Sequence, residues 1–447
     1  MASSRKGEPD PCGVIAACLA SHLPAGGKLA VGYSGGLDST VLLHVLASLR
    51  GRFPIHLSAV HVHHGLSPQA DAWARHCQSV CDALNVPLIV SRVQVCPTGQ
   101  GLEAAAREAR YGVFVQQAVD ALMLAHHRDD QAETVLLQLR RGASARGLAA
   151  MPEARPLHET TLLLRPFLQL SRAHLEAYAQ DHALTWVEDE SNQDPSLARN
   201  DVRHTLLPVL DGAIPGMSRA LAHAAEQFAE WAELLDEMAD LDGAAGVDAS
   251  GLEVVRLAGL TEIRARNLLR RVLEQQGVQI RRQALIEATR QLCAAGHNAQ
   301  VRVDFGDSSV VRFQGRVHVV PRRVFDPIPE MGIPCRLDAH LDLNLGLGGA
   351  GRLDFRFVEG QGVSLAGEPV LIRHRQAGDR MRLRPGQMQR PLKDLLRESG
   401  IPPWFRPWLP VAEVDGRVAW VAGLGAAAEF QADAASPAWA ISWVPPW

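Results

Sequence analysis

Lys28-Leu-Ala-Val-Gly-Tyr-Ser-Gly-Gly-Leu-Asp-Ser-Thr40 reads as a short apolar strand, a pair of glycines and the start of a helix. The first turn of a helix has backbone N–H groups without intrahelical partners and the positive end of the helix dipole. Gly35 and Gly36 let the backbone approach an anion without interference from a Cβ atom. Ser34 and Ser39 add hydroxyl donors. This segment therefore predicts a cradle for phosphate groups.

Asp38 lies inside this predicted phosphate loop. Its carboxylate would repel a phosphate ligand unless a cation lay between the two groups. Mg²⁺ commonly takes this place, because it binds one or two carboxylates together with phosphate oxygens and water. We therefore expect Asp38 to bind Mg²⁺, directly or through water.

The chain up to about residue 210 alternates strand-like and helix-like segments. The expected strands are 29–33, 55–62, 87–93, 122–125 and 162–164, and the expected helices are 39–49, 69–84, 102–119, 130–139 and 172–182. This alternation predicts an α/β domain with a doubly wound parallel sheet. In such a sheet the ligand binds at the carboxyl ends of the strands.

Changes of pattern along the 447 residues predict three domains. Residues 1–212 are expected to form the catalytic α/β domain, and residues 213–325 a mainly helical middle domain with paired strands over 301–320. The stretch 220–248 has eight acidic residues and no Lys or Arg, which we interpret as a solvated helix face. Residues 326–447 are expected to form a linker and a small α+β C-terminal domain.

Composition narrows the class of protein. The net charge is -4, so an RNA partner would have to be recognised by local basic patches. The seven cysteines include no CxxC pair, which argues against a disulfide framework or a structural zinc site. No run of about 18 apolar residues occurs, so we expect a cytoplasmic protein without a membrane span.

The loop is neither of the common nucleotide-binding motifs, because it lacks the Gly-Lys-Ser/Thr of a Walker A loop and the GxGxxG dinucleotide fingerprint. It resembles the pyrophosphate-binding loop, S-G-G-x-D-S, of the N-type ATP pyrophosphatases. That resemblance implies cleavage of ATP between its α- and β-phosphates and transfer of AMP to an oxygen of the substrate. It also implies that ATP is bound by Ser34, Gly35, Gly36, Leu37, Asp38 and Ser39.

Four further segments resemble the tRNA(Ile)-lysidine synthetases of this superfamily, in the family's order. They are His61-Val-His-His-Gly-Leu66, Glu103-Ala-Ala-Ala-Arg-Glu-Ala-Arg-Tyr111, Ala125-His-His-Arg-Asp-Asp-Gln-Ala-Glu-Thr134 and the segment from Trp186 to Arg203. Two positions depart from the family pattern, since Ser67 and Ala145 stand where the family has Arg and Gly. The resemblance is strong from about residue 25 to about residue 210.

These segments supply the remaining candidate site residues. Asp130 and Glu133 fall on one face of a helix, where their carboxylates would bind the ammonium groups of a lysine or a metal ion. Arg199 and Arg203 also share a face and would contact RNA phosphate or an ATP intermediate, unless they pair with nearby acids such as Asp189 and Asp194. The expected catalytic residues are Asp38, His126, Asp130, Glu133 and Arg203, and His61 and Arg107 are expected to bind ATP. No role is assigned to His63 and His64.

Residues 370–407 are basic, with eight Arg and one Lys against three acids. Arg380, Arg382 and Arg384 alternate, which would place them on one side of a strand. Basic residues beside aromatic ones suit RNA binding by phosphate contact and base stacking, although tryptophans can instead belong to a small core. The pattern resembles the terminal domain of the longer lysidine synthetases. We expect tRNA contacts from Arg380, Arg382 and Lys393, beside the aromatic residues Trp404, Phe405 and Trp408.

The resemblance implies ligation of L-lysine to the wobble cytidine in the CAU anticodon of tRNA(Ile). ATP would adenylate the C2 oxygen, and the lysine ε-amine would then displace AMP. The amine proton would pass to His126, His127 or a carboxylate. The sequence leaves that choice open, and likewise the oligomeric state, a homodimer included. The alternative is a tRNA thiolation enzyme of the same fold, but such enzymes often carry the CxxC pairs that this chain lacks.

Overall fold

The computed structural model describes residues 10–96, 101–188, 198–244, 246–248, 251–278, 280–294, 301–328, 331–337, 343–346, 351–365, 369–433 and 436–446. The chain divides into two compact units, Met1–Leu235 and Asp236–Trp447.

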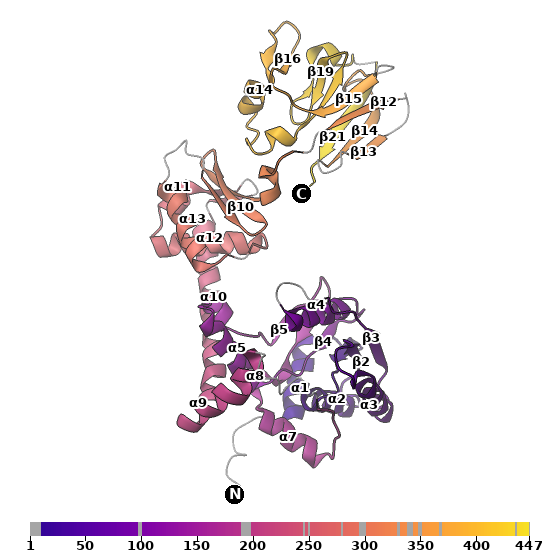
Figure 1. Cartoon of the computed structure of the whole chain (residues 1–447), viewed down its shortest axis with the longest axis vertical. Helices are drawn as coiled ribbons and strands as arrows, with labels where there is room; N and C mark the ends of the chain where they lie inside the picture. The colour runs from indigo at the N-terminus through magenta and orange to yellow at the C-terminus, as the bar shows by residue number, and fades with distance from the viewer. Residues whose placement is uncertain are drawn as a thin grey trace. The chain divides into compact units, whose positions relative to one another are not determined.

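The first unit is built on a six-stranded sheet in the order β3-β2-β1-β4-β6-β5 (Figure 1). Its strands are β1 (Lys28–Gly32), β2 (His56–His63), β3 (Leu88–Arg92), β4 (Ala121–Met123), β5 (Ala154–Pro156) and β6 (Leu162–Leu164). All neighbouring strands run parallel except β5, which is antiparallel to β6. The predicted doubly wound parallel sheet is therefore confirmed, and β5 is an edge strand that the sequence did not indicate.

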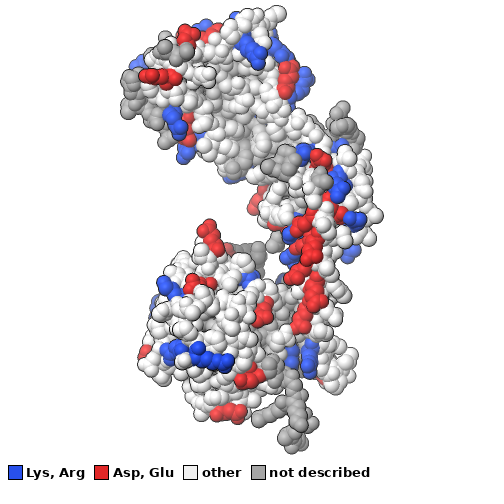
Figure 2. Space-filling model, turned by 180° about the vertical axis from the view of Figure 1, so that it is seen from behind, with Lys and Arg blue, Asp and Glu red and all other residues white. Residues whose placement is uncertain are grey.

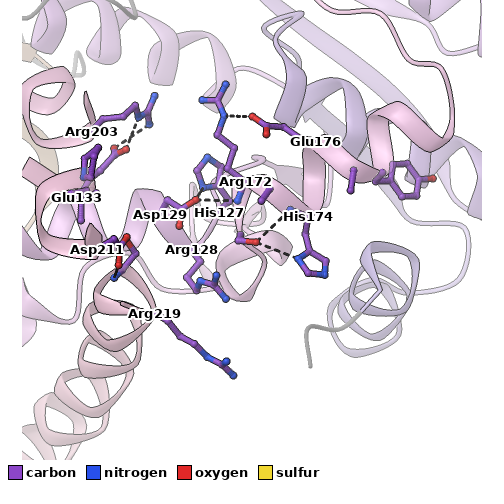
Figure 3. Close-up of a pocket in the computed structure, with 18 of the residues that line it drawn as sticks. His127, Arg128, Asp129, Glu133, Arg172, His174, Glu176, Arg203, Asp211 and Arg219 are labelled. Atoms are coloured by element: carbon purple, nitrogen blue, oxygen red, sulfur yellow. Dashed lines mark hydrogen bonds and ion pairs between the residues drawn. The ribbon is translucent and has the colours of Figure 1, made fainter. Parts of the chain in front are cut away.

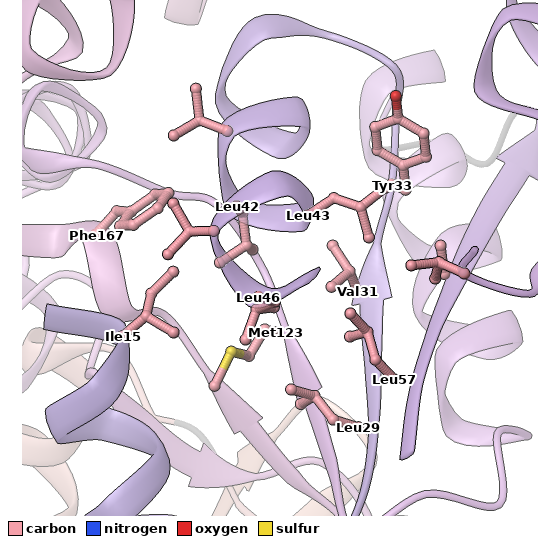
Figure 4. Packing of buried hydrophobic residues seen from close by; sticks show 14 of the residues in the cluster. Ile15, Leu29, Val31, Tyr33, Leu42, Leu43, Leu46, Leu57, Met123 and Phe167 are labelled. Carbon is pink, nitrogen blue, oxygen red and sulfur yellow. The ribbon is translucent and has the colours of Figure 1, made fainter. Parts of the chain in front are cut away.

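Helices cover both faces of this sheet. The helices of this part of the chain are α1 (Pro11–His22), α2 (Leu37–Leu49), α3 (Ala70–Ala83), α4 (Leu102–Val115), α5 (Arg128–Arg140), α6 (Ala145–Leu148), α7 (Arg172–Asp181), α8 (Ala198–Asp201), α9 (Leu207–Ala213) and α10 (Met217–Gly243), with a π-helical turn, η3 (Val202–Leu206), between α8 and α9. Leu29 and Val31 of β1 pack with Leu42 and Leu46 of α2 on one face (Figure 4). Ala30 points to the other face and packs with Phe114 of α4 and its neighbours. Alternation along β1 thus places one core on each side of the sheet.

The order of the strands creates a switch point beside β1. The chain leaves β1 toward β2 and β3 on one side, and β4 then pairs with the opposite side of β1. The segments that follow β1 and β4 diverge there, and ligands bind in the crevice that results. The loop before α2 and the residues before α5 lie at this point.

The middle part of the chain mixes helices with a sheet. Helices α11 (Val254–Ala258), α12 (Glu262–Gln275) and α13 (Arg282–Ala294) share a core with strands of a five-stranded antiparallel sheet. That sheet has the order β7-β8-β11-β10-β9 and consists of β7 (Val247–Asp248), β8 (Gly251–Glu253), β9 (Arg302–Phe305), β10 (Ser308–Phe313) and β11 (Arg316–Pro321). The paired strands expected over 301–320 are confirmed, and β7 and β8 extend them.

The acidic run is not a solvated helix face along its whole length. Asp236 and Asp240 of α10 pair with Arg271 of α12 at 2.9 and 2.8 Å. Asp242 is almost fully buried and pairs with Arg264 of the same helix. Figure 2 shows acidic side chains in a row along α10 with basic ones beside them. The interpretation as solvated acids is wrong at these positions, because their cationic partners come from a helix later in the chain. Arg271, for example, lies 31 residues after Asp240 and 35 residues after Asp236.

The C-terminal part consists of small sheets around one core. A five-stranded sheet, β12-β15-β18-β19-β20, and a three-stranded sheet, β13-β14-β21, share this core with α14 (Leu392–Glu398). The strands are β12 (Gly332–Arg336), β13 (Leu343–Gly346), β14 (Arg352–Glu359), β15 (Pro369–His374), β18 (Pro410–Val414), β19 (Arg417–Val421), β20 (Gly425–Ala426) and β21 (Pro437–Val444), and a separate pair is formed by β16 (Arg380–Met381) and β17 (Arg390–Pro391). This agrees with the small α+β domain that the sequence predicted.

No helix in the described ranges is both long enough and apolar enough to cross a membrane.

Candidate active site

The glycine-rich segment forms a tight loop at the start of α2. Gly36 is the residue before the helix, and no side chain caps the helix there. The hydroxyls of Ser34 and Ser39 lie 3.0 Å apart, and the Thr40 hydroxyl donates to the Gly36 carbonyl at 2.9 Å. Intraloop contacts thus fix the serines, while the first backbone N–H groups of α2 stay available for an anion. The helix begins at Leu37, two residues earlier than expected.

The back of the loop is formed by residues that the sequence did not single out for it. Gly35 has a φ of +86°, and a Cβ atom at this position would lie 2.8 Å from Cys77 Sγ and 3.1 Å from Val187 Cγ2. The Val187 N–H donates to the Gly35 carbonyl at 2.9 Å. His61, expected to bind ATP, is buried behind the loop, with Nδ1 3.0 Å from the Tyr33 carbonyl and 3.5 Å from Cys77 Sγ. His61 thus supports the loop from behind through Tyr33 and Cys77, and its expected contact with ATP stays a prediction.

Gly35→Ala is expected to disrupt the loop, because alanine would meet backbone strain and two close contacts at once. Strain of this kind costs about 1–3 kcal/mol. Gly36→Ala is the matched control, since nothing lies closer than 3.5 Å to a Cβ atom there. Urea denaturation should show a lower free energy of unfolding for Gly35→Ala than for Gly36→Ala. Equal values for the two variants would contradict the role given to Gly35.

Asp38 meets a group of charged residues at the switch point. His127 Nε2 lies 3.8 Å from the Asp38 carboxylate and 3.5 Å from that of Asp130, and Nδ1 lies 3.8 Å from Asp129. Asp38 Oδ1 is buried without a hydrogen-bond partner. Burial raises the pKa of Asp38, the charge of His127 opposes this rise, and Asp130 adds to it. An ionised carboxylate held there without a full set of partners is the kind of group that a cation would stabilise.

Asp130 and Glu133 are held by two arginines. Arg199 donates from Nε to Glu133 and from Nη2 to Asp130, both at 2.7 Å. Arg203 donates from Nε to Glu133 at 2.5 Å and from Nη2 to Asp130 at 2.8 Å. Glu133 is only 1% exposed and Asp130 6%. We call these four residues the carboxylate–arginine tetrad.

In the tetrad, each of the two acids accepts hydrogen bonds from both arginines, a pairing that the sequence analysis did not predict. The two acids share a helix face, as predicted, and that face meets the guanidinium groups of Arg199 and Arg203. Burial favours the neutral form of Asp130, but the charges of His127, Arg199 and others outweigh it and hold the pKa below its usual range. Asp189 and Asp194, the other acids considered for the arginines, lie outside the described residues.

His126 follows β4 and lies close to two arginines, Arg107 of α4 and Arg165 after β6. Burial lowers the pKa of His126 to about 3, with further contributions from Arg165, Arg199 and Arg107 against the opposing charge of Asp130. His126 is therefore an uncharged imidazole at neutral pH, and its Nδ1 is buried without a partner. The Arg107 guanidinium lies over the ring of Tyr111, 4.9 Å from its centroid. Arg165, which follows β6, is buried in this group and was not predicted from the sequence.

His63 contacts charged side chains outside the phosphate loop. Its Nε2 lies 3.1 Å from Asp71, which also accepts from Arg92 at 2.7 Å. Among the described residues no group of three or more His, Cys, Asp or Glu could hold a metal ion.

A large pocket lies beside His127, the residue that also faces Asp38 of the phosphate loop. Its volume is about 1250 Å³, and it is lined by α5, α7, η3, α9 and the start of α10. Figure 3 shows its charged lining, which includes Arg172, Arg219, Asp129, Glu176 and Asp211. Glu133 and Arg203 also line it, so the pocket reaches the tetrad.

The basic C-terminal residues are less uniform than the sequence indicated. Arg380 starts a strand of two residues only, so the expected row with Arg382 and Arg384 on one strand is wrong. The Arg380 guanidinium donates to the Gln389 carbonyl at 2.7 Å, and Arg382 pairs with Glu429 at 3.4 Å. Lys393 is exposed on α14.

The tryptophans of this region are core residues. Trp404 is 8% exposed and packs against Phe313 at 5.5 Å and Phe325 at 6.4 Å between ring centroids. Trp408 donates to the Val324 carbonyl at 2.9 Å. Of the two alternatives for these rings, the structure supports the core, and base stacking by Trp404 and Trp408 is excluded in this arrangement.

Comparisons with known proteins agree with the geometry. Three family models match the chain: the PP-loop domain at residues 16–210, the TilS substrate binding domain at 252–318 and the TilS substrate C-terminal domain at 370–443. A tRNA(Ile)-lysidine synthase of Azoarcus sp. is 41% identical over 94% of this chain and 92% of its own length. One from Alkalilimnicola ehrlichii is 43% identical over 93% of this chain and 94% of its own length.

Proposed function

The chain belongs to the tRNA(Ile)-lysidine synthase family, and from this we propose that it ligates L-lysine to the wobble cytidine of tRNA(Ile) at the expense of ATP. The meeting of the phosphate loop, Asp38 and the tetrad at the switch point carries the proposal. The thiolation alternative is less supported, because the matched family models include the TilS substrate-binding and C-terminal domains.

We further propose residues 1–212 as the catalytic domain and 213–325 and 326–447 as tRNA-contacting domains. A cytoplasmic location and a homodimer stay predictions.

The loop suits the first step, adenylation of the cytidine. The N–H groups of α2 and the Ser34 and Ser39 hydroxyls would hold the β- and γ-phosphates. The C2 oxygen of the cytidine attacks the α-phosphorus, the bond to the bridging oxygen of the β-phosphate breaks, and pyrophosphate leaves. The negative charge that develops on the leaving group is stabilised by donors already fixed in place, which is the larger part of such catalysis.

Asp38 fits a Mg²⁺ ligand. Its Oδ1 is buried without a partner, and burial raises its pKa by more than the charges of His127, Arg172 and Arg203 lower it. Mg²⁺ takes one or two carboxylates and completes its shell with phosphate oxygens and water, so no preformed cage of acids is needed. When bound, the ion would neutralise charge on the phosphates.

The pocket beside His127 suits lysine. A zwitterionic amino acid needs a cation for its carboxylate and an anion for its α-ammonium group, and Arg172, Arg219, Asp129 and Asp211 supply both along the lining. The ε-amine would then point toward His127 and the tetrad. This arrangement replaces direct binding of the ammonium by Asp130 and Glu133, whose oxygens the arginines occupy.

The amine must lose a proton when its nitrogen attacks C2 and AMP leaves. His126 is a weak base, because its pKa is lowered to about 3 by burial and nearby arginines. His127 both lines the pocket and faces the loop, with Asp129 beside Nδ1 at 3.8 Å. We therefore assign the role of proton acceptor to His127 in its neutral form, so that His127 becomes the charged partner of the nearby carboxylates as it takes the proton, and that of a neutral hydrogen-bonding group to His126.

The function is tested by incubating the protein with ATP, labelled lysine and tRNA(Ile) bearing the CAU anticodon. We expect one AMP and one pyrophosphate for each lysine incorporated. Cadaverine, which has the amine without the carboxylate, should compete poorly with lysine if the pocket arginines hold the carboxylate. Absence of lysine incorporation, with sulfur transfer to the tRNA in its place, would favour the thiolation alternative.

A further inference from the structure

Three arginines surround one tyrosine beside the reaction centre. Arg107 of α4 and Arg155 of β5 lie over the Tyr111 ring, at 4.9 and 5.6 Å from its centroid. Arg107 Nη2 also donates to the Tyr111 hydroxyl at 3.3 Å, and the charge of Arg165, immediately after β6, acts on Tyr111 and lowers its pKa. We call these four residues the Tyr111 cluster. Among the described residues, none of its arginines forms an ion pair with a carboxylate.

The cluster carries positive charge that its surroundings do not compensate. Arg165 is 2% exposed, donates from Nη1 to the Pro152 carbonyl at 2.8 Å, and has a buried Nε without a partner. Burial raises the pKa of Tyr111, but Arg107 and Arg165 outweigh it and lower the pKa below its ordinary value. A guanidinium donor that is buried and unsatisfied is costly unless a ligand accepts from it. The chemistry of this group matches an anion with several oxygens, such as a phosphate.

The position of the cluster decides which phosphate it fits. Arg165 follows β6 and Arg155 lies in the neighbouring strand β5, whereas the phosphate loop follows β1, and β4 lies between β1 and β6. These two arginines are therefore at least two strand spacings, about 10 Å, from the loop. ATP phosphates held at the loop would not reach Arg155 or Arg165. His126, which follows β4, lies between the two sites as a neutral group suited to a base.

We propose that the Tyr111 cluster holds one backbone phosphodiester of the anticodon loop, next to the reacting cytidine. This rests on the proposed function and deepens it. It also moves the ligand of Arg107 from ATP, as expected from the sequence, to RNA. The rim arginines Arg107 and Arg155 meet the phosphate oxygens, and the buried Arg165 adds its positive charge behind them.

The test measures binding of an anticodon stem-loop without ATP or lysine, so its outcome is separate from that of the ligation assay. Each phosphate of the loop is replaced in turn by an uncharged methylphosphonate. With the wild-type protein, one position is expected to weaken binding by about tenfold, as loss of a charged hydrogen bond would. Arg155→Gln should weaken binding of the unmodified RNA similarly, and the same methylphosphonate should cost this variant nothing further.

Arg52→Gln is the matched control. Arg52 also lies over an aromatic ring, Phe53, at 5.4 Å, but in the segment that leads from α2 into the amino end of β2, whereas Arg165 follows the carboxyl end of β6. The Arg52→Gln variant should bind the unmodified stem-loop and each methylphosphonate-substituted stem-loop with the affinity of the wild type. Equal melting temperatures for the two variants would exclude a folding defect as the cause. The proposal is overturned if Arg155→Gln and the methylphosphonates act independently at every position, or if Arg155→Gln weakens ATP binding and leaves RNA binding unchanged.

Discussion

Asp38→Asn is expected to lower the rate of AMP formation by about a thousandfold, because it removes the proposed cation ligand from the phosphate loop. The same variant should be more stable than the wild type without ligands. Burial raises the pKa of Asp38, so its ionised form is disfavoured in the folded protein at neutral pH. A neutral amide removes that cost. Thermal denaturation without ATP and Mg²⁺ should therefore show a higher melting temperature.

Asp71→Asn provides the control for this pair of measurements. Asp71 is an exposed carboxylate whose pKa is lowered by its hydrogen bond and charge interaction with Arg92. Neutralising it should not raise the melting temperature, and AMP formation should continue. If Asp38→Asn formed AMP at the wild-type rate, the role of the loop in adenylation would be wrong. If it lost activity together with stability, a folding defect would explain the loss.

Glu133→Met is expected to destabilise the protein by about 3–5 kcal/mol, because it leaves two arginines with a single acid in a buried site. Glu133 accepts hydrogen bonds from Arg199 at 2.7 Å and from Arg203 at 2.5 Å. The double variant with Glu133→Met and Arg203→Met keeps the Asp130–Arg199 pair and restores charge balance. Its free energy of unfolding should return close to the wild-type value, since apolar residues often replace buried ion pairs without loss.

The double variant separates stability from catalysis. We expect it to fold and yet to form lysidine at a small fraction of the wild-type rate, because Arg203 is proposed to act at the reaction centre. Urea denaturation gives the first quantity, and incorporation of labelled lysine the second. Near-normal incorporation by the double variant would show that the tetrad serves only to hold α5 and η3 together.

Local patterns predicted the parts of the molecule that local physics determines. The loop at Ser34–Ser39 requires glycines, hydroxyls and a helix start within a few residues, and all of these can be read along the chain. The parallel sheet follows from alternating strands and helices. The short β5 could not be predicted, since Ala154–Pro156 has only three residues and no apolar alternation.

Pairings between distant residues escaped the same reasoning. The sequence indicated that Asp130 and Glu133 share one helix face and that Arg199 and Arg203 share another. Nothing in the local sequence indicated that these two faces contact each other. The opposite error occurred at Arg380–Arg384, where alternation indicated a strand although Pro385 and Gly386 follow directly and form a turn. Trp404 was ambiguous because its partners, Phe313 and Phe325, lie about 80 to 90 residues earlier in the sequence.

The tetrad also bears on the order in which the chain can fold during synthesis. The hydrogen bonds to Asp130 and Glu133 span 66 to 73 residues, so the ribosome releases α5 well before Arg199 and Arg203. Until then, burying α5 would strand two carboxylates without counter-charges. Strands β1 to β4 can associate earlier through their apolar faces. We therefore expect the active site to form late in folding, after α8 and η3 have paired with α5 over this long separation.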